Sequence, residues 1–134
     1  MLELYPRSEI NITVHVLEAD GSIICTIINA ITLALMDSGI AMSDMVTACS
    51  VGQVRGQFCA DVNQVEQNSG GAFIPLAIKG RSEDVIFLQL DSKISVNNLE
   101  EAMTVAIDGC RVMKNYLEQA MQKCMSESLE SQGL

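Results

Sequence analysis

The chain has 134 residues, of which 49% are hydrophobic, and its formal net charge at pH 7 is −9. This length is enough for one domain with a real core, and the acidic balance argues against a free-standing nucleic-acid binder, which usually presents a basic face. No apolar run reaches the roughly 18 residues of a membrane-spanning helix, and no signal peptide is recognisable at the start. We therefore expect an intracellular protein outside the membrane. If a nucleic acid is its ligand, the chain must share the binding with basic neighbours.

The five cysteines are scattered along the chain and include no Cys-x-x-Cys pair. An odd number with such spacing argues against a disulfide framework and against a zinc site. We expect small buried thiols in a reducing compartment, with no metal and no cofactor. These residues are Cys25, Cys49, Cys59, Cys110 and Cys124.

The first predicted element is a strand over residues 10–17, because apolar and polar residues alternate there. Such a strand has one buried and one wetter face. His15, the sole histidine, lies on the polar face and is expected to be an ordinary surface or interface residue. The apolar set is Ile10, Ile12, Val14 and Val16.

A glycine turn over residues 18–22 leads into a predicted helix from about Ser22 to Asp37. The helix is apolar nearly all round, which predicts that it is covered on several sides. A strand, a glycine turn and a helix N-terminus together attract anions, because backbone N–H groups point out of the turn. Such a site usually adds a cationic side chain, and no Lys or Arg lies between Ser8 and Gln53.

Four further strands follow in the middle of the chain, separated by glycine turns. The first is predicted to be fully buried, and the last two form a hairpin. Pro75 predicts that its strand lies at an edge or carries a bulge. The ranges are 45–51, 57–62, 73–78 and 85–90.

The last element is a long helix, because apolar residues recur at spacings of four and three from Leu99 to Cys124. The stripe is expected to pack against a sheet, with a coiled coil as the alternative. We expect one domain over residues 1–125 and a flexible tail over 126–134. The order of elements predicts an α+β fold, a sheet with helices packed on one face.

The passage from Tyr5 to Ile40, followed by residues 49–52, resembles the RNase PH family, and in particular the RNase PH-like ring subunits of the eukaryotic exosome. The resemblance runs from about Leu4 to Met121. It implies the ribosomal protein S5 domain 2-like fold. It covers only the C-terminal part of a family domain, so the N-terminal part, with further strands and basic RNA-contacting loops, is expected to be missing.

The resemblance implies that the phosphate loop has lost its charge. Active members carry Gly-Gly-Thr-Arg at this turn, and the arginine holds the attacking phosphate. Here the matching residues are Gly21, Ser22, Ile23 and Ile24, so Ile24 stands where the arginine would be. Gly21 and Ser22 are the remnant of the loop.

A second motif of the family matches residues 60–67. Active relatives place acids at the positions of Asp61 and Gln67, and such carboxylates protonate the leaving oxygen or hold Mg²⁺ during phosphorolysis. Asp61 alone keeps its place, as a vestigial catalytic candidate or as an ordinary turn acid. Glu66 lies one residue early, and a one-residue shift points a side chain elsewhere.

The resemblance implies a non-catalytic structural subunit of the exosome core ring, which supports 3′→5′ processing and degradation of RNA, rRNA included, by guiding it to associated nucleases. Its partners would be other ring and cap subunits, with RNA met through the assembled complex in nucleus, nucleolus and cytoplasm. Two alternatives stay open. In the first, the chain is an active phosphate-dependent 3′→5′ exoribonuclease. In the second, it is a truncated product that only self-associates or binds ring partners.

Arg7 and Arg55 are the candidate RNA-facing charges, with a surface or interface ion pair as the alternative reading. Both flank the strands around the degenerate site. The isolated chain is expected to be a homo-oligomer, because its apolar helices need more cover than so short a sheet provides. Strand pairing and helix packing across a two-fold axis are both open routes.

Overall fold

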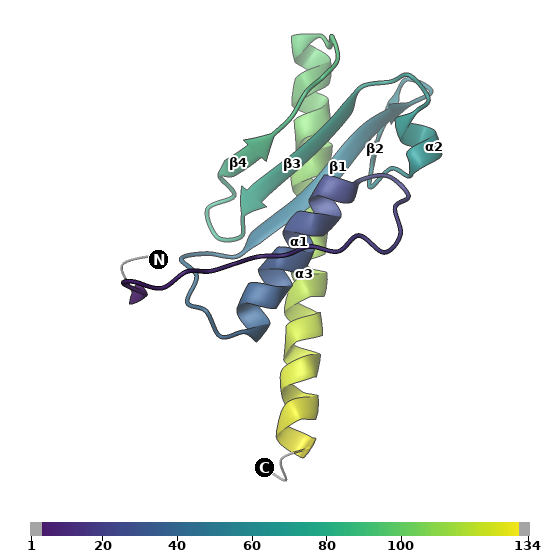
Figure 1. Cartoon of the computed structure of the whole chain (residues 1–134). Helices are drawn as coiled ribbons and strands as arrows, with labels where there is room; N and C mark the ends of the chain where they lie inside the picture. The colour runs from purple at the N-terminus through teal and green to yellow at the C-terminus, as the bar shows by residue number, and fades with distance from the viewer. Residues whose placement is uncertain (1–3, 132–134) are drawn as a thin grey trace.

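The structure is a computed structural model that describes residues 4–131 (Figure 1). Its strands form one antiparallel sheet in the order β2-β1-β3-β4. This confirms the predicted α+β class. The helices are α1 (Ile23–Asp37), α2 (Gln64–Gln67) and α3 (Val96–Ser131), and the strands are β1 (Val46–Val54), β2 (Gln57–Ala60), β3 (Phe73–Lys79) and β4 (Val85–Leu88).

The two long helices cover opposite faces of the sheet, with α1 in front and α3 behind in Figure 1. On strand β1, Cys49 packs in one core with Ala106 of α3, whereas its neighbour Ala48 packs in a second core with Cys25 of α1. The prediction that the helices share one face is therefore wrong. The physical reason is that β1 is apolar on both sides, with an unbroken buried stretch, and so both of its faces need cover.

Helix α1 is fastened to β1 by polar side chains. Asn29 donates through Nδ2 to the carbonyl of Ala48 (2.9 Å) and accepts from its N–H (2.8 Å), and Thr32 donates to the carbonyl of Val46 (2.8 Å). Strand β2 pairs only with the last four residues of β1, so these side chains satisfy the edge that β2 leaves open. Asn29 and Thr32, two polar residues of a mainly apolar helix, thus lie on its buried side.

The outer side of α1 stays partly open. Ile23 is 37% exposed and Ile24 is 41% exposed. The predicted helix exists, but the expected cover on several sides is incomplete within the described residues.

Residues 8–20 form a segment that we call the strap, which crosses over α1 (Figure 1). It is not a strand, because it has no ladder partner among the described residues, and the prediction of a strand over 10–17 is wrong in this respect. The alternation of side chains is real, but alternation cannot supply the neighbouring strand that a sheet requires.

Helix α3 has 36 residues, and its first half packs against the sheet as predicted. Gly109 allows this approach, because a Cβ there would lie 2.5 Å from Cys49 Sγ. The stripe is buried or half-buried as far as Leu117, whereas Ala120 and Cys124 are exposed where the helix runs past the sheet. The predicted tail begins inside this helix: residues 126–131 are helical and exposed, and residues 132–134 lie outside the described part.

The hairpin of β3 and β4 exists. The prediction that the strand with Pro75 lies at an edge or carries a bulge is wrong. Strand β3 lies between β1 and β4, and the register shift beside Ala77 and Ile78 places its extra residue, Ile86, in β4. Among residues 4–131, no helix is long and apolar enough to cross a membrane.

Candidate functional site

The two sequence motifs meet in space at the start of α1. Gly21 (φ 81°) and Ser22 (φ 53°) both adopt the left-handed conformation, and a Cβ on Gly21 would lie 2.5 Å from the carbonyl carbon of Asn63. A side chain at this glycine would therefore clash with the backbone that precedes α2. The turn and the segment 60–67 are in direct contact, as one site requires.

Two groups of Ser22 make three hydrogen bonds here, two with the second motif and one with β1. Its hydroxyl donates to the carbonyl of Val62 (2.8 Å) and makes a short hydrogen bond with the hydroxyl of Ser50, and its backbone N–H donates to Gln67 Oε1 (3.4 Å). The side chain is buried, at 5% exposure. The hydroxyl is thereby drawn away from α1, whose N-terminus has no side-chain cap and no acid in its first turn.

Ile24 and Gln67 line the same small hollow, of about 170 Å³, between the first turn of α1 and α2. These are the two positions at which the sequence departs from active relatives. None of the described residues lining the hollow is charged; the others are Ile23, Gln64 and Phe73. An uncapped helix N-terminus attracts an anion weakly, but nothing here adds the full charge that would hold a phosphate firmly or the acid that would protonate a leaving group.

Asp61 lies beside this site without lining the hollow. Asp61 is exposed and has a φ of 57°. Its backbone N–H donates to the carbonyl of Ser50 (2.8 Å). Its backbone thus holds the motif against β1. A chemical role for its carboxylate stays a prediction.

Glu66 serves the local structure of α2, which the sequence analysis missed. Its carboxylate accepts from the N–H of Asn63 (3.0 Å), and its own N–H donates to Asn63 Oδ1 (2.9 Å). This reciprocal pair is a capping box, and the spacing of Asn63 and Glu66 was the signal for it. The one-residue shift does point this acid away from the hollow of Gln67.

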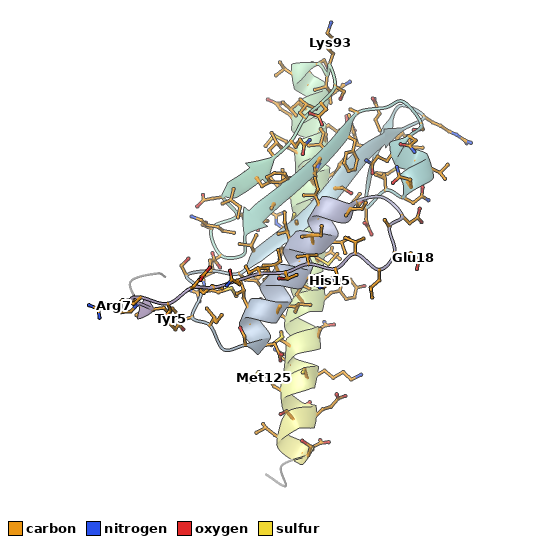
Figure 2. All side chains as sticks on the ribbon, viewed as in Figure 1. Tyr5, Arg7, His15, Glu18, Lys93 and Met125 are labelled. Carbon is orange, nitrogen blue, oxygen red and sulfur yellow. The ribbon has the colours of Figure 1, made fainter. Side chains whose placement is uncertain are left out.

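Arg55 lines a larger hollow of about 570 Å³ on the other side of α2. It lies in the tight turn between β1 and β2 and is exposed. Glu66, Ser69 and the backbone of Gly70 and Gly71 also line this hollow. Arg7 lies at the outer end of the strap, far from α2 (Figure 2), so the two candidate arginines belong to different surfaces.

The buried thiols have no reactive character. Burial raises the pKa of Cys25 and of Cys110 from 9.0 to about 12, and burial also raises the pKa of Cys49. Cys59 and Cys124 are exposed, against the expectation of burial for all five. Within residues 4–131, no group of three or more potential metal ligands is found.

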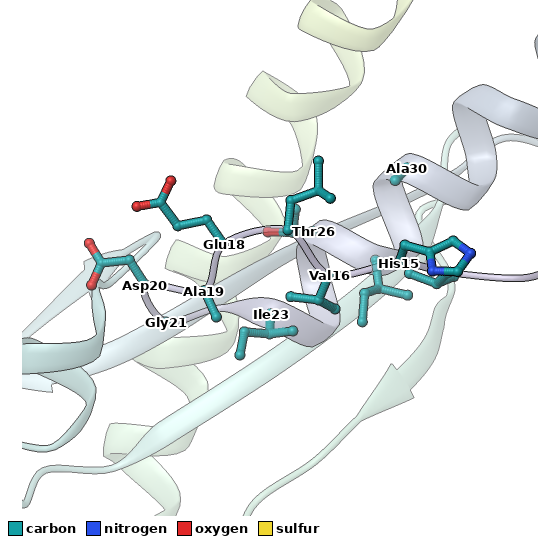
Figure 3. Close-up of a pocket in the computed structure, with 12 residues that line it drawn as sticks. His15, Val16, Glu18, Ala19, Asp20, Gly21, Ile23, Thr26 and Ala30 are labelled. Carbon is teal, nitrogen blue, oxygen red and sulfur yellow. The ribbon is translucent and has the colours of Figure 1, made fainter.

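A third hollow, of about 250 Å³, lies between the strap and α1. Figure 3 shows His15 and Val16 on the strap side, Ile23 and Thr26 on the helix side, and the acids Glu18 and Asp20 near its end. This hollow is mainly apolar and lies along the unpaired segment.

Comparison with known families gives two matches along the chain. Residues 1–41 match domain 1 of the 3′ exoribonuclease family, and residues 44–109 match its domain 2.

Among curated relatives, the exosome complex component RRP41 of Mus musculus is 38% identical over 133 residues, which is 99% of this chain and 54% of that protein. SKI6 of Saccharomyces cerevisiae, also an exosome complex component, is 37% identical over 123 residues, 92% of this chain and 50% of that protein. Rrp41 of the archaeon Thermococcus onnurineus is 35% identical, over 99% of this chain and 53% of that protein. The chain thus spans about half the length of the relatives it matches.

A solved structure, rice Rrp46, superposes with a TM-score of 0.73 at 20% identity, covering 79% of this chain and 51% of that one. At this identity the likeness shows the fold alone. It confirms the RNase PH-like fold.

Proposed function

We propose that this chain, which belongs to the 3′ exoribonuclease family, acts as a non-catalytic structural subunit of an exosome core ring. Its relatives are named exosome complex components. In this role it supports 3′→5′ processing and degradation of RNA by associated nucleases. Because the chain spans about half of those relatives, the activity and partners of the whole protein are part of the proposal.

One observation carries the non-catalytic reading: Ile24 and Gln67 face the same hollow, and none of its described lining residues is charged. Phosphorolysis needs a tightly held phosphate anion and a proton or metal for the leaving oxygen. Loss of a single preorganised transition-state contact typically costs about a hundredfold in rate. Because the charged residues for the phosphate and for the leaving oxygen are both missing from this hollow, we expect little catalysis.

An active phosphate-dependent exoribonuclease is the second candidate. It is favoured by the retained Asp61 and by the uncapped N-terminus of α1. Backbone N–H groups alone bind an anion weakly, and Asp61 does not line the hollow. The two candidates differ in phosphate-dependent product release, which is measurable directly.

The proposed partners are other ring and cap subunits of the exosome, in nucleus, nucleolus and cytoplasm. The test is to purify the tagged chain at its native level and to measure the intact mass of the assembly and of its co-purifying chains. We expect stoichiometric ring and cap subunits. Recovery of the chain alone, or only with its own copies, would favour the truncated product that acts through self-association.

RNA is met through the assembled complex in this proposal, with Arg55 and Arg7 as contacts. A chain of net charge −9 releases few counterions on its own, so the isolated chain should bind single-stranded RNA weakly. In the complex, Arg55→Ala should reduce affinity and flatten its salt dependence by about one counterion. Arg81→Ala, which removes an exposed arginine at the β3–β4 turn, is the matched control and should change neither.

We further propose that the isolated chain is a homo-oligomer, at least a dimer. The strap and the outer side of α1 expose apolar side chains together, including Ile12 (52%) and Ile24 (41%). A stable interface buries on the order of 1,000 Å² or more. Sedimentation at micromolar concentration measures the state, and a cooperative monomer would contradict this part of the proposal.

A further inference from the structure

The strap is held at both ends and is unpaired between them. Near one end the N–H of Ala41 donates to the Tyr5 hydroxyl (3.0 Å), and at the other the N–H of Gln64 donates to Asp20 Oδ1 (3.3 Å). Within residues 4–131, no backbone group from Glu9 to Ala19 makes a hydrogen bond. The segment is therefore a preorganised edge with free donors and acceptors, which is a template for strand pairing.

The side chains of the strap have the pattern of a half-buried strand. The apolar residues occur at every second position and are between 40% and 55% exposed. Two of them, Val14 and Val16, line the hollow of about 250 Å³ between the strap and α1 (Figure 3). A second strand beside the strap would cover these side chains and the outer side of α1 together. The exposed set is Ile10, Ile12, Val14 and Val16.

The strap is complementary to itself when it is turned antiparallel. Only registers with a residue on the two-fold axis keep the apolar residues on one face, because a one-residue slip exposes them. With Ile12 on the axis, Ile10 lies opposite Val14 of the second copy, and Glu9 lies opposite His15 of the second copy. The carboxylate of Glu9 can then accept an N–H from the imidazole of His15.

A register about Thr13 also keeps the apolar face, but it places Glu9 opposite Leu17 and leaves that carboxylate without a partner. Opposite polar pairs stabilise an antiparallel ladder, and a two-fold register has two of them. The charge pattern therefore favours Ile12 as the centre.

We propose that two copies of this chain pair through their straps as antiparallel strands about a two-fold axis at Ile12, which buries both apolar rows over the two α1 helices. This rests on the proposed self-association and names its interface. Of the two routes, strand pairing is favoured over packing of α3, because the strap combines free backbone groups with a self-complementary sequence.

The test uses single cysteines at exposed strap positions, in a chain whose exposed Cys59 and Cys124 are changed to Ser. Opposite Cβ atoms in an antiparallel pair lie about 4.5–5.5 Å apart, close to the reach of a disulfide. Under mild oxidation, Ile12→Cys should cross-link most of the chain into dimers. Leu17→Cys is the matched control: Leu17 is 98% exposed, so random collision would favour it, yet the register places it far from its copy.

A second arm measures the dimer itself. Ile12→Lys places two like charges at the axis and should raise the dissociation constant about tenfold or more, whereas Leu17→Lys should change it little. A stable dimer that neither cross-links at position 12 nor responds to Ile12→Lys would overturn this interface and leave self-association standing. Cross-linking through Thr13→Cys alone would overturn the register. A protein that stays monomeric at all concentrations tested would overturn both the strap interface and the proposed self-association. It would not test the proposed assembly into a ring.

Discussion

The two long helices pack on the two faces of the sheet through different interactions, α3 through apolar contacts and α1 also through side-chain hydrogen bonds to β1. On the α3 face the core is apolar and closed, with Leu76, Ala106 and Cys110 at 0% exposure. On the α1 face the helix is fastened by Asn29 and Thr32, while its outer side leaves Ile23 37% exposed. The α3 face is thus complete within the chain, whereas the α1 face and the strap offer apolar surface for a partner to cover.

The largest expected effect is the loss of a large side chain from the closed core. Leu76→Ala should lower the free energy of unfolding by about 2–5 kcal/mol, because it removes buried methyl groups and leaves a cavity. Ile23→Ala, on the open side of α1, should cost about 1 kcal/mol or less. Urea unfolding at one fixed protein concentration measures both, since self-association shifts apparent stability. Equal losses would erase the contrast between the faces.

A smaller effect is expected at the polar fastening of α1. Asn29→Ala leaves the N–H and the carbonyl of Ala48 without their partner and should cost about 1–3 kcal/mol. Thr26→Ala is the control, since Thr26 is exposed on the same helix and bonds only to the carbonyl of Ser22. If the two variants unfold alike, the fastening contributes nothing and α1 is held by apolar contact alone.

The buried thiols give the mildest test. At pH 8 a thiol reagent should label Cys59 and Cys124 quickly, and the three buried cysteines only after unfolding. The pKa of Cys25 is raised from 9.0 to about 12, so the folded state keeps a proton that the unfolded state loses. The contribution of the protonated Cys25 to the free energy of unfolding is therefore complete below pH 9, and it is lost as the pH rises toward 12. Fast labelling of all five thiols would show that the α1 core opens readily.

The helices and the central strands were predictable because each carries its own periodic signal. The α3 stripe up to Leu117 and the buried stretch of β1 both have the expected structure. The meeting of Ile24 and Gln67 in one hollow also agrees with the motif comparison. These features depend on residues close together in the chain or on a shared family pattern.

Other features depended on the neighbours that a segment has in space. The strap alternates like a strand, yet no strand lies beside it within residues 4–131. The buried role of Asn29 was hidden because a polar residue on an apolar helix usually faces water, and here it satisfies an open strand edge instead. Periodicity describes a single element and does not say which backbone groups need a partner.

The most direct test of the central claim is an assay of phosphate-dependent RNA cleavage. The protein, alone and in its purified assembly, is incubated with single-stranded RNA, Mg²⁺ and inorganic phosphate, and nucleoside diphosphates are measured over time. The account predicts no phosphate-dependent release attributable to this chain, so that Asp61→Ala leaves the product yield unchanged. Steady phosphate-dependent release that Asp61→Ala abolishes would contradict the account and establish the chain as an active exoribonuclease.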